Sequence, residues 1–358
     1  MKTEKYSKAV ATNMVIANMI GTGVFTAIGY QVMTDVIPDP FTILTIWVVG
    51  GIFSLCGAFV YSEVASCVNR SGGEYSFLSE LYHPLLGFLS GWISIIVGFS
   101  ASIAALALVI GEYFLPLIGL SKTYTISLLS IELPIQKVVA LSSIILIALV
   151  HIRGVKFGGI FQNYITAFKL LIIGLIIVVP FIYFGYEPSN ISFSPTGETS
   201  DTILSSAFAG SLVWVMFSYS GWNASTYILG NLENPKKTLP FSLIYGTLAV
   251  TVIYVLLNFT FMYVASFQEL EGQIDVGNVV MQKVLGNNAS LIVSGIFSFA
   301  LLSGLSAMMI AGPRVAEEIG KDFNLFKVLG KQNSKGNPVT AIIFLTTISS
   351  LLVIFSSF

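Results

Sequence analysis

Charged residues are scarce in this sequence. They make up only 10% of its 358 residues, with 17 basic and 18 acidic side chains, whereas hydrophobic residues make up 55%. A soluble globular domain carries charge at roughly a quarter of its positions, so this composition excludes an ordinary soluble enzyme or binding domain. We therefore expect an integral membrane protein.

Cysteine and histidine are also few. Cys56 and Cys67 fall in the same apolar segment, and His83 and His151 lie far apart at the ends of such segments. These positions provide no disulfide framework and no metal-ligand spacing. They also place no nucleophile beside a base, so we expect no enzyme, no metal site and no cofactor. The sequence shows no re-entrant loop of the kind that forms a channel filter, which argues against an ion channel.

Long apolar runs take the place of the missing charge. Residues 141–150 and 170–184 are apolar on every face, which is typical of membrane helices and not of the alternating strands of an outer-membrane barrel. Runs of about 20 apolar residues are long enough to cross the hydrocarbon core as helices. We predict an all-α protein with nine membrane spans, at residues 9–31, 42–67, 85–117, 134–151, 159–184, 202–230, 240–265, 289–312 and 338–356.

The basic residues are distributed unequally between the loops. With the N-terminus in the cytoplasm, thirteen of the seventeen lysines and arginines fall in inner segments, as the positive-inside rule requires. We therefore expect a multi-pass protein of the cell membrane with a cytoplasmic N-terminus. Residues 72–83 and 266–286 mix charged and apolar side chains at helical spacing, and we predict that both lie along the membrane surface.

Two of the predicted spans contain residues that weaken helices. The first carries Gly21, Thr22 and Gly23, and the sixth has the run FSYSGWN at residues 217–223. Backbone groups freed by an unwound turn must meet water, an ion or a polar ligand, because hydrocarbon cannot satisfy them. Since these spans are five apart, two five-span halves would have opposite orientations, as in transporters whose interrupted helices form the binding site. The alternative is that the glycines only let helices approach closely.

Lys169 is the other informative residue. An ammonium group among apolar neighbours in the fifth span costs roughly 2.5–3.5 kcal/mol on insertion scales, and such residues usually face partners inside the bundle. No acidic residue lies within one helical turn of Lys169. We expect its partners to be carbonyl or hydroxyl oxygens of other spans, which an unwound first span would supply. The alternative is that the side chain extends to the cytoplasmic face.

Four motifs in order resemble the amino acid–polyamine–organocation transporters, particularly the L-type amino acid transporter branch. They are IGTGVF in the first span, YSEVASCVNRSGGEYSFL at the end of the second, FSYSGWNASTYILGNLENPKKTLP through the sixth and GPRVAEEIGKD after the eighth. The resemblance runs from Ala11 to the last residue. It implies one transporter domain over residues 1–358, built from two inverted five-helix repeats with discontinuous helices one and six. The first repeat would cover residues 9–184, and the second, incomplete repeat residues 202–358.

The resemblance also implies a binding site. The backbone of the first break would receive the carboxylate and ammonium groups of an amino acid, carbonyls of the second break would complete the ammonium site, and the Phe217 ring would act as a gate. The residues implied are Ile20, Gly21, Thr22, Gly23, Val24, Phe217, Ser218, Ser220 and Gly221. Lys169 matches a lysine that replaces a sodium ion in sodium-independent relatives and ties span one to span eight. Ser303 is its expected contact in span eight.

The sequence departs from the family pattern in two ways. It stops after the ninth span, whereas the family fold continues, so we expect an incomplete transporter. Residues 118–133 contain no cysteine, although animal L-type relatives use one there to bond a heavy chain. No disulfide-linked heavy chain is therefore expected.

The resemblance predicts a sodium-independent amino acid permease or exchanger that works by alternating access. Neutral substrates are favoured because no acidic side chain lies at midplane depth to pair with a second substrate cation, although aromatic rings and carbonyls also recognise cations. Two alternatives stay open. One is an antiporter of basic amino acids or polyamines, and the other is a membrane subunit or inactive fragment that does not transport.

Overall fold

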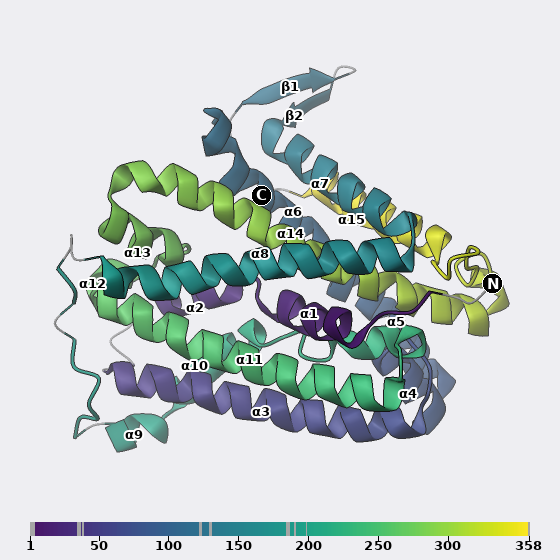
Figure 1. Cartoon of the computed structure of the whole chain (residues 1–358), viewed down its shortest axis with the longest axis horizontal. Helices are drawn as coiled ribbons and strands as arrows, with labels where there is room; N and C mark the ends of the chain where they lie inside the picture. Colours follow the sequence, from purple (N-terminus) through teal and green to yellow (C-terminus); the bar gives the residue numbers. More distant parts are fainter. Residues whose placement is uncertain are drawn as a thin grey trace.

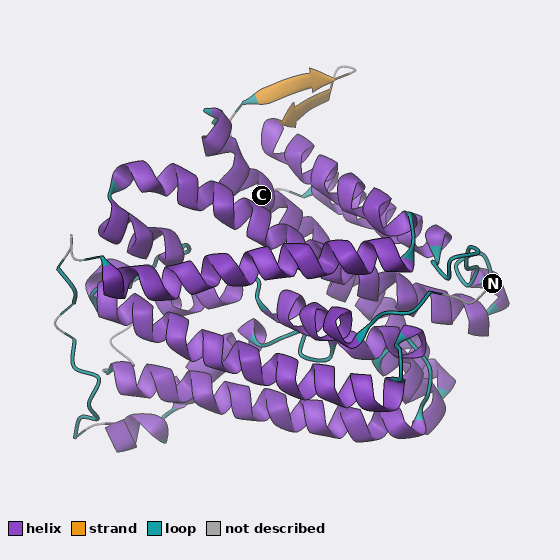
Figure 2. Ribbon diagram, viewed as in Figure 1, coloured by secondary structure: helices purple, strands orange, loops and turns teal. Residues whose placement is uncertain are grey.

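The computed structural model describes residues 4–33, 37, 39–121, 124–128, 131–183, 187–189, 191–197 and 199–356. Helices make up most of this chain, and a two-stranded hairpin projects from them at one edge (Figure 2). Within the described residues, seven helical segments are long and apolar enough to cross a membrane: Lys8–Gln31, Pro40–Cys67, Pro84–Ile118, Ile135–Ile152, Val155–Ile182, Pro235–Val264 and Val293–Asp322. The expected all-α membrane fold is confirmed.

The predicted interruptions of two spans are present. The first span divides into α1 (Lys8–Met19) and α2 (Gly23–Gln31), and the sixth into α10 (Ser206–Ser218) and the 3-10 helix η3 (Ala224–Asn231). Five other predicted spans are single helices, namely α3 (Pro40–Cys67), α7 (Ile135–Ile152), α8 (Val155–Ile182), α11 (Pro235–Val264) and α15 (Val339–Phe355). The apolar helices α10 and α15 are shorter than the seven long spans.

Short elements connect the spans. One predicted surface segment contains α4 (Glu74–Leu81), and the other contains α12 (Phe267–Leu270) and α13 (Val276–Leu285). Helix α9 (Thr199–Ile203) precedes α10, and the 3-10 helix η4 (Asn324–Phe326) lies near the C-terminal end. The hairpin pairs β1 (Thr125–Leu128) antiparallel to β2 (Ile131–Pro134), with Thr125 opposite Pro134.

The third span is not a regular α-helix. It begins as α5 (Pro84–Ile93), becomes a π-helix, η1 (Ser94–Ala101), and returns to an α-helix, α6 (Ser102–Phe114), before the 3-10 turn η2 (Leu115–Ile118). π-Helical turns are rare and often occur at functional sites. The apolar pattern of the sequence did not predict this change of helix type.

Helix α14 (Asn287–Asp322) runs through the interior of the bundle (Figure 1). Its apolar part is the most deeply buried of the seven long spans, and it contacts α1, α6, α8, α13 and α15. Helix α11 contacts both α3 and α1. We call residues 68–83, 231–237 and 314–338 the basic end of the bundle. This is the end at which α1 begins, whereas α12 and α13 lie at the opposite end (Figure 1).

The helix that contains the predicted eighth span extends beyond residue 312, because α14 continues to Asp322. Arg314 lies 2.8 Å from Glu317, and Lys321 lies 2.6 Å from Glu317 and 2.8 Å from Glu318. Opposite charges three and four residues apart stabilise a helix. Because these pairs satisfy the charges locally, the helix continues past the apolar run into the basic end.

Candidate functional site

The two interrupted helices touch each other inside the bundle. A Cβ atom at Gly23 would lie 2.7 Å from the Ser218 Oγ, and one at Gly221 would lie 2.7 Å from the Asn18 Nδ2. Gly221 also has a φ of +99°, which glycine adopts without steric strain. Close approach of the two breaks therefore requires glycine at both positions. This agrees with the alternative from the sequence, that the glycines let helices approach closely.

Gly21 has a different environment. A Cβ atom there would have no neighbour within 4 Å, and the residue lines a cavity of about 340 Å³. The cavity lies between the two breaks, η1, α6 and α14. Its volume is near the lower limit of the range of about 300–1,000 Å³ that is typical of small-molecule sites. The contact between the breaks thus leaves an open space beside it.

Seven of the nine residues expected at the binding site line this cavity. They are Gly21, Thr22, Gly23, Phe217, Ser218, Ser220 and Gly221. The other two, Ile20 and Val24, are buried beside the break. The Phe217 side chain is exposed, with a relative accessibility of 73%. The structure therefore brings the expected residues together, and their binding of a ligand stays a prediction.

Residues that the motifs did not single out form the facing wall. Ser94 and Gly98 come from η1, Ser102 from α6 and Met308 from α14. None of the described residues that line the cavity is ionisable at neutral pH. The charges of any zwitterionic ligand would therefore have to be met by backbone groups, hydroxyls and the side-chain amides of Asn18 and Asn223.

The helix ends at the breaks supply such backbone groups. The first turn of a helix leaves N–H groups without intrahelical partners, and Thr22, the residue before α2, makes no side-chain capping bond to them. The N-terminus of a helix also carries partial positive charge, which favours an anion such as a carboxylate. At the second break, the Phe217 carbonyl already accepts the Ser220 amide at 3.0 Å. A carbonyl oxygen has a second lone pair, so it can still accept a hydrogen bond from an ammonium group.

Tyr254 of α11 joins the two breaks. Its buried hydroxyl oxygen lies 2.6 Å from the Met19 carbonyl oxygen and 2.9 Å from the Ser218 carbonyl oxygen. A tyrosine hydroxyl has one hydrogen to donate, and here it is shared between one carbonyl of each break. Sequence reasoning missed this residue, because a single tyrosine in an apolar span carries no pattern that marks it.

Lys169 is buried on α8, with 2% of its surface exposed. Its Nζ donates to the carbonyl oxygens of Ala17 at 3.2 Å and Ile20 at 2.5 Å, at the end of α1. The side chain thus reaches the broken first span and does not extend to the surface. A Cβ atom at Gly304 would lie 3.8 Å from the same Nζ, so the amine is also close to α14.

Ser303 of α14 is the residue that we expected to contact Lys169, but its hydrogen bonds in the described structure go to other residues. Its hydroxyl donates to the Ala300 carbonyl at 2.9 Å, and its carbonyl accepts from the Gln162 Nε2 at 3.2 Å. Gln162 also donates to the Thr166 hydroxyl at 3.0 Å. Gln162, Thr166 and Lys169 are four and three residues apart, so they share one face of α8. That spacing is a sequence signal that could have identified Gln162 as a second polar contact to α14.

Asn223 and Tyr227 line the cavity where it borders the basic end. The Asn223 amide donates to the Glu74 carboxylate and, at 3.3 Å, to the Tyr227 hydroxyl. The Tyr227 ring meets the Phe99 ring edge-on, with 5.0 Å between centroids. Sequence reasoning also missed Glu74 as a neighbour of the site, because its segment showed only the pattern of a surface helix.

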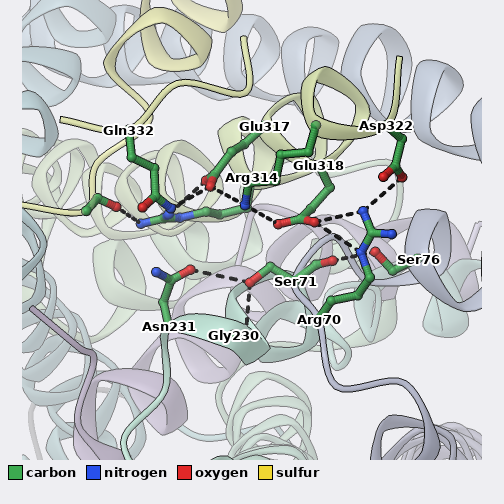
Figure 3. A network of polar contacts seen from close by, with 12 residues as sticks. Arg70, Ser71, Ser76, Gly230, Asn231, Arg314, Glu317, Glu318, Asp322 and Gln332 are labelled. Atoms are coloured by element: carbon green, nitrogen blue, oxygen red, sulfur yellow. Dashed lines mark hydrogen bonds and ion pairs between the residues drawn. The ribbon is translucent and has the colours of Figure 1, made fainter. Parts of the chain in front are cut away.

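A network of ion pairs connects the loop after α3 to the end of α14 (Figure 3). The Arg70 guanidinium lies 2.9 Å from Glu318 and 2.8 Å from Asp322, and the Tyr75 hydroxyl donates to Asp322 at 2.5 Å. Burial, together with the hydrogen bond to Asp322, raises the pKa of the Tyr75 hydroxyl, so it stays a proton donor. These contacts hold the loop after α3 against the end of α14.

Comparisons with known proteins show the family to which the chain belongs. The family profile described as amino acid permease matches residues 9–358. The serine/threonine exchanger SteT of Bacillus subtilis is 31% identical over 73% of this chain and 55% of its own length. The b(0,+)-type amino acid transporter 1 of Oryctolagus cuniculus is 27% identical over 95% of this chain and 68% of its own length. The large neutral amino acids transporter small subunit 2 of Homo sapiens is 28% identical over 97% of this chain and 63% of its own length.

The chain thus spans between 55% and 68% of the length of these relatives. The matched residues include both interrupted helices, Lys169 and the ion-pair network of the basic end. The resemblance inferred from the four motifs is confirmed, and the chain belongs to the amino acid permease family.

Proposed function

We propose that this chain is a secondary amino acid transporter, a permease or exchanger that works by alternating access. The observation that carries the proposal is the cavity of about 340 Å³ at the contact between the two interrupted helices. Transporters with broken helices bind their substrates at such places, because the free helix ends present backbone groups to the ligand. The names of the similar proteins describe amino acid exchange or transport.

The N-terminal end of α2 is the proposed site for the substrate carboxylate. Amides near Thr22 and Gly23 would donate to it, and the partial positive charge of the helix end would stabilise it. The carbonyls of Phe217, Ser218 and Ser220 would receive the substrate ammonium group. The exposed Phe217 ring, at the edge of the cavity, would close over the bound substrate.

The proposed substrates are neutral amino acids. None of the described residues that line the cavity carries a charge at neutral pH, so a second substrate cation would be buried without a counter-ion, at a cost of several kcal/mol. Lysine or putrescine as the preferred substrate would favour the alternative of a basic amino acid or polyamine antiporter.

Transport is proposed to be independent of sodium. In sodium-coupled transporters, carbonyls freed by unwound helices coordinate the ion. Here the Lys169 amine bonds the carbonyls of Ala17 and Ile20, so a side-chain donor already occupies the carbonyls at that end of α1.

The basic end of the bundle is proposed to face the cytoplasm of a cell-membrane protein, because basic segments stay on that side. The ion-pair network at this end and the exposed Phe217 support an outward-facing arrangement as part of this proposal. We propose no disulfide-linked heavy chain, since residues 118–133 contain no cysteine.

The test is counterflow of labelled serine into liposomes that contain the purified chain, with Gly21→Leu as the variant. A Cβ atom at Gly21 would have no neighbour within 4 Å, and Gly21 lines the cavity, so folding should persist while counterflow falls at least tenfold. Gly210→Leu is the matched control, because Gly210 on α10 is also without neighbours but does not line the cavity. Equal counterflow in the Gly21→Leu protein and the wild type would refute the site. A wild-type chain without counterflow of any amino acid would support the non-transporting alternative.

A further inference from the structure

Glu74 does not line the cavity, but its side chain contacts a residue that does. It is the first residue of α4, and its Oε1 accepts a hydrogen bond from Asn223, which lines the cavity. The preceding residue, Gly73, has a φ of +57°, and a Cβ atom there would lie 2.6 Å from the Tyr227 ring. Glycine at position 73 thus lets the start of α4 approach the floor of the cavity.

The carboxylate of Glu74 has no cation beside it in the described part of the chain. Its Oε2 is buried and has no hydrogen-bond partner there. The titratable groups that face it are the hydroxyls of Tyr61 from α3 and Tyr227 from η3. The acids of neighbouring α14 differ, since Glu318 is paired with Arg70 and Lys321.

A carboxylate that leaves water without gaining a cation depends on its hydrogen-bond donors. For Glu74 the donor in the described part of the chain is the Asn223 amide, and the hydroxyls of Tyr61 and Tyr227 are the other polar groups that face the carboxylate. Acidic side chains within the spans of pumps and transporters commonly carry protons. Glu74 lies at the basic end and not within a span, but its carboxylate bonds Asn223, which lines the cavity.

We propose that Glu74 is the proton-binding site through which a pH gradient drives amino acid uptake by this chain. The inference rests on the proposed transport function. While the cavity is open to the outside, a proton from its water converts the carboxylate to a carboxylic acid. When the basic end opens, the acid releases that proton to the other side. One proton thus enters with each amino acid.

The bond between Glu74 and Asn223 connects proton binding to movement. It joins the segment that follows α3 to the second interrupted helix. Hydrogen bonds to an ionised acceptor are roughly twice as strong as neutral ones, so protonation weakens this connection. Loss of the charge therefore loosens a contact between the basic end and the second interrupted helix.

The experiment uses liposomes that contain the full chain and the dye pyranine, with the membrane potential held at zero by potassium and valinomycin. The inside is kept at about pH 7.5 and the outside at about pH 6.5. One proton per neutral substrate allows up to about tenfold accumulation across one pH unit. The wild type should accumulate labelled serine severalfold, and added serine should acidify the interior.

Glu74→Gln should abolish both responses while counterflow of serine at equal pH persists within about threefold of the wild type. Glu63→Gln is the matched control, because Glu63 is an exposed acid of α3, and it should retain both responses. Tyr61→Phe removes a hydroxyl that faces the carboxylate, which destabilises the charged form. Its half-maximal uptake should therefore shift to higher external pH, and this variant decides the matter if Glu74→Gln fails to fold.

Several results would overturn the proton-binding role. One is a wild type that exchanges serine at equal pH but does not accumulate it across the pH gradient and shows no acidification. This result would support transport and contradict proton coupling. Another is a Glu74→Gln protein that accumulates serine like the wild type. A third is loss of lysine exchange in Glu74→Gln with an intact gradient response, which would make Glu74 a counter-ion for cationic substrates.

Discussion

The hydroxyl of Tyr254 is the smallest group whose removal should disturb both helix breaks. Tyr254→Phe keeps the ring, which meets Trp47 at 5.2 Å and Tyr219 at 5.0 Å between centroids. It removes the donor shared by the Met19 and Ser218 carbonyls. The Met19 carbonyl keeps the Gly21 amide at 2.9 Å, so the loss falls mainly on Ser218. A buried acceptor left without its partner costs about 1–3 kcal/mol.

This cost should appear in stability and in substrate affinity. Thermal unfolding in detergent should occur at a lower temperature, and the KM for serine counterflow should rise about 5- to 30-fold if 1–2 kcal/mol of the cost falls on the binding-competent arrangement. Tyr245→Phe is the control, since it makes the same change on the same helix at an exposed position. The reasoning would be refuted if Tyr254→Phe and Tyr245→Phe had the same unfolding temperature and the same KM.

Two further substitutions test the remaining contacts. Lys169→Met leaves the Ala17 and Ile20 carbonyls without their donor, so serine counterflow should fall at least tenfold, whereas Lys156→Met, at an exposed position of the same helix, should be neutral. Wild-type counterflow should be unchanged when choline replaces sodium, and a steep sodium requirement would contradict the role of Lys169. Arg70→Ala removes the bonds to Glu318 and Asp322, and one such charge-assisted bond is worth roughly 1.5–3 kcal/mol. A cysteine placed at buried Ser225 should therefore react about tenfold faster with a thiol reagent that is applied to the basic end. Arg153→Ala, outside that network, should leave the reaction rate unchanged, and equal rates in both variants would contradict a closing role for Arg70.

Local sequence patterns were sufficient to predict the spans and their interruptions. The bounds of α3 and α7 agree with the apolar runs within two residues, because hydrocarbon selects for length and apolarity alone. Both breaks lie where glycine and serine weaken the helix. One wall of the cavity follows from the same residues, since glycine permits the contact of Gly23 with Ser218, whereas the facing wall comes from other spans.

Contacts between distant segments were not predictable in this way. The shared bond of Tyr254 and the position of Glu74 below the cavity depend on how α11 and α4 are placed by the whole bundle. The extension of α14 depends on charge pairs that the hydropathy pattern counts only as polar residues. Gln162 is an intermediate case, because its spacing from Lys169 was visible while its partner Ser303 was not.

The π-helix of the third span has a consequence for how the cavity wall can change. Ser94, Gly98 and Ser102 all line the cavity at intervals of four residues. In an α-helix these three positions would spread over about 80° of the surface, and the wider π turn reduces that spread. Deleting one residue from Ser94–Ala101 would turn the preceding part of the span by about 100° relative to the rest. The shape of this wall is therefore set by the length of the segment as well as by its side chains. An insertion or deletion there would alter substrate preference without any amino-acid substitution in the cavity lining.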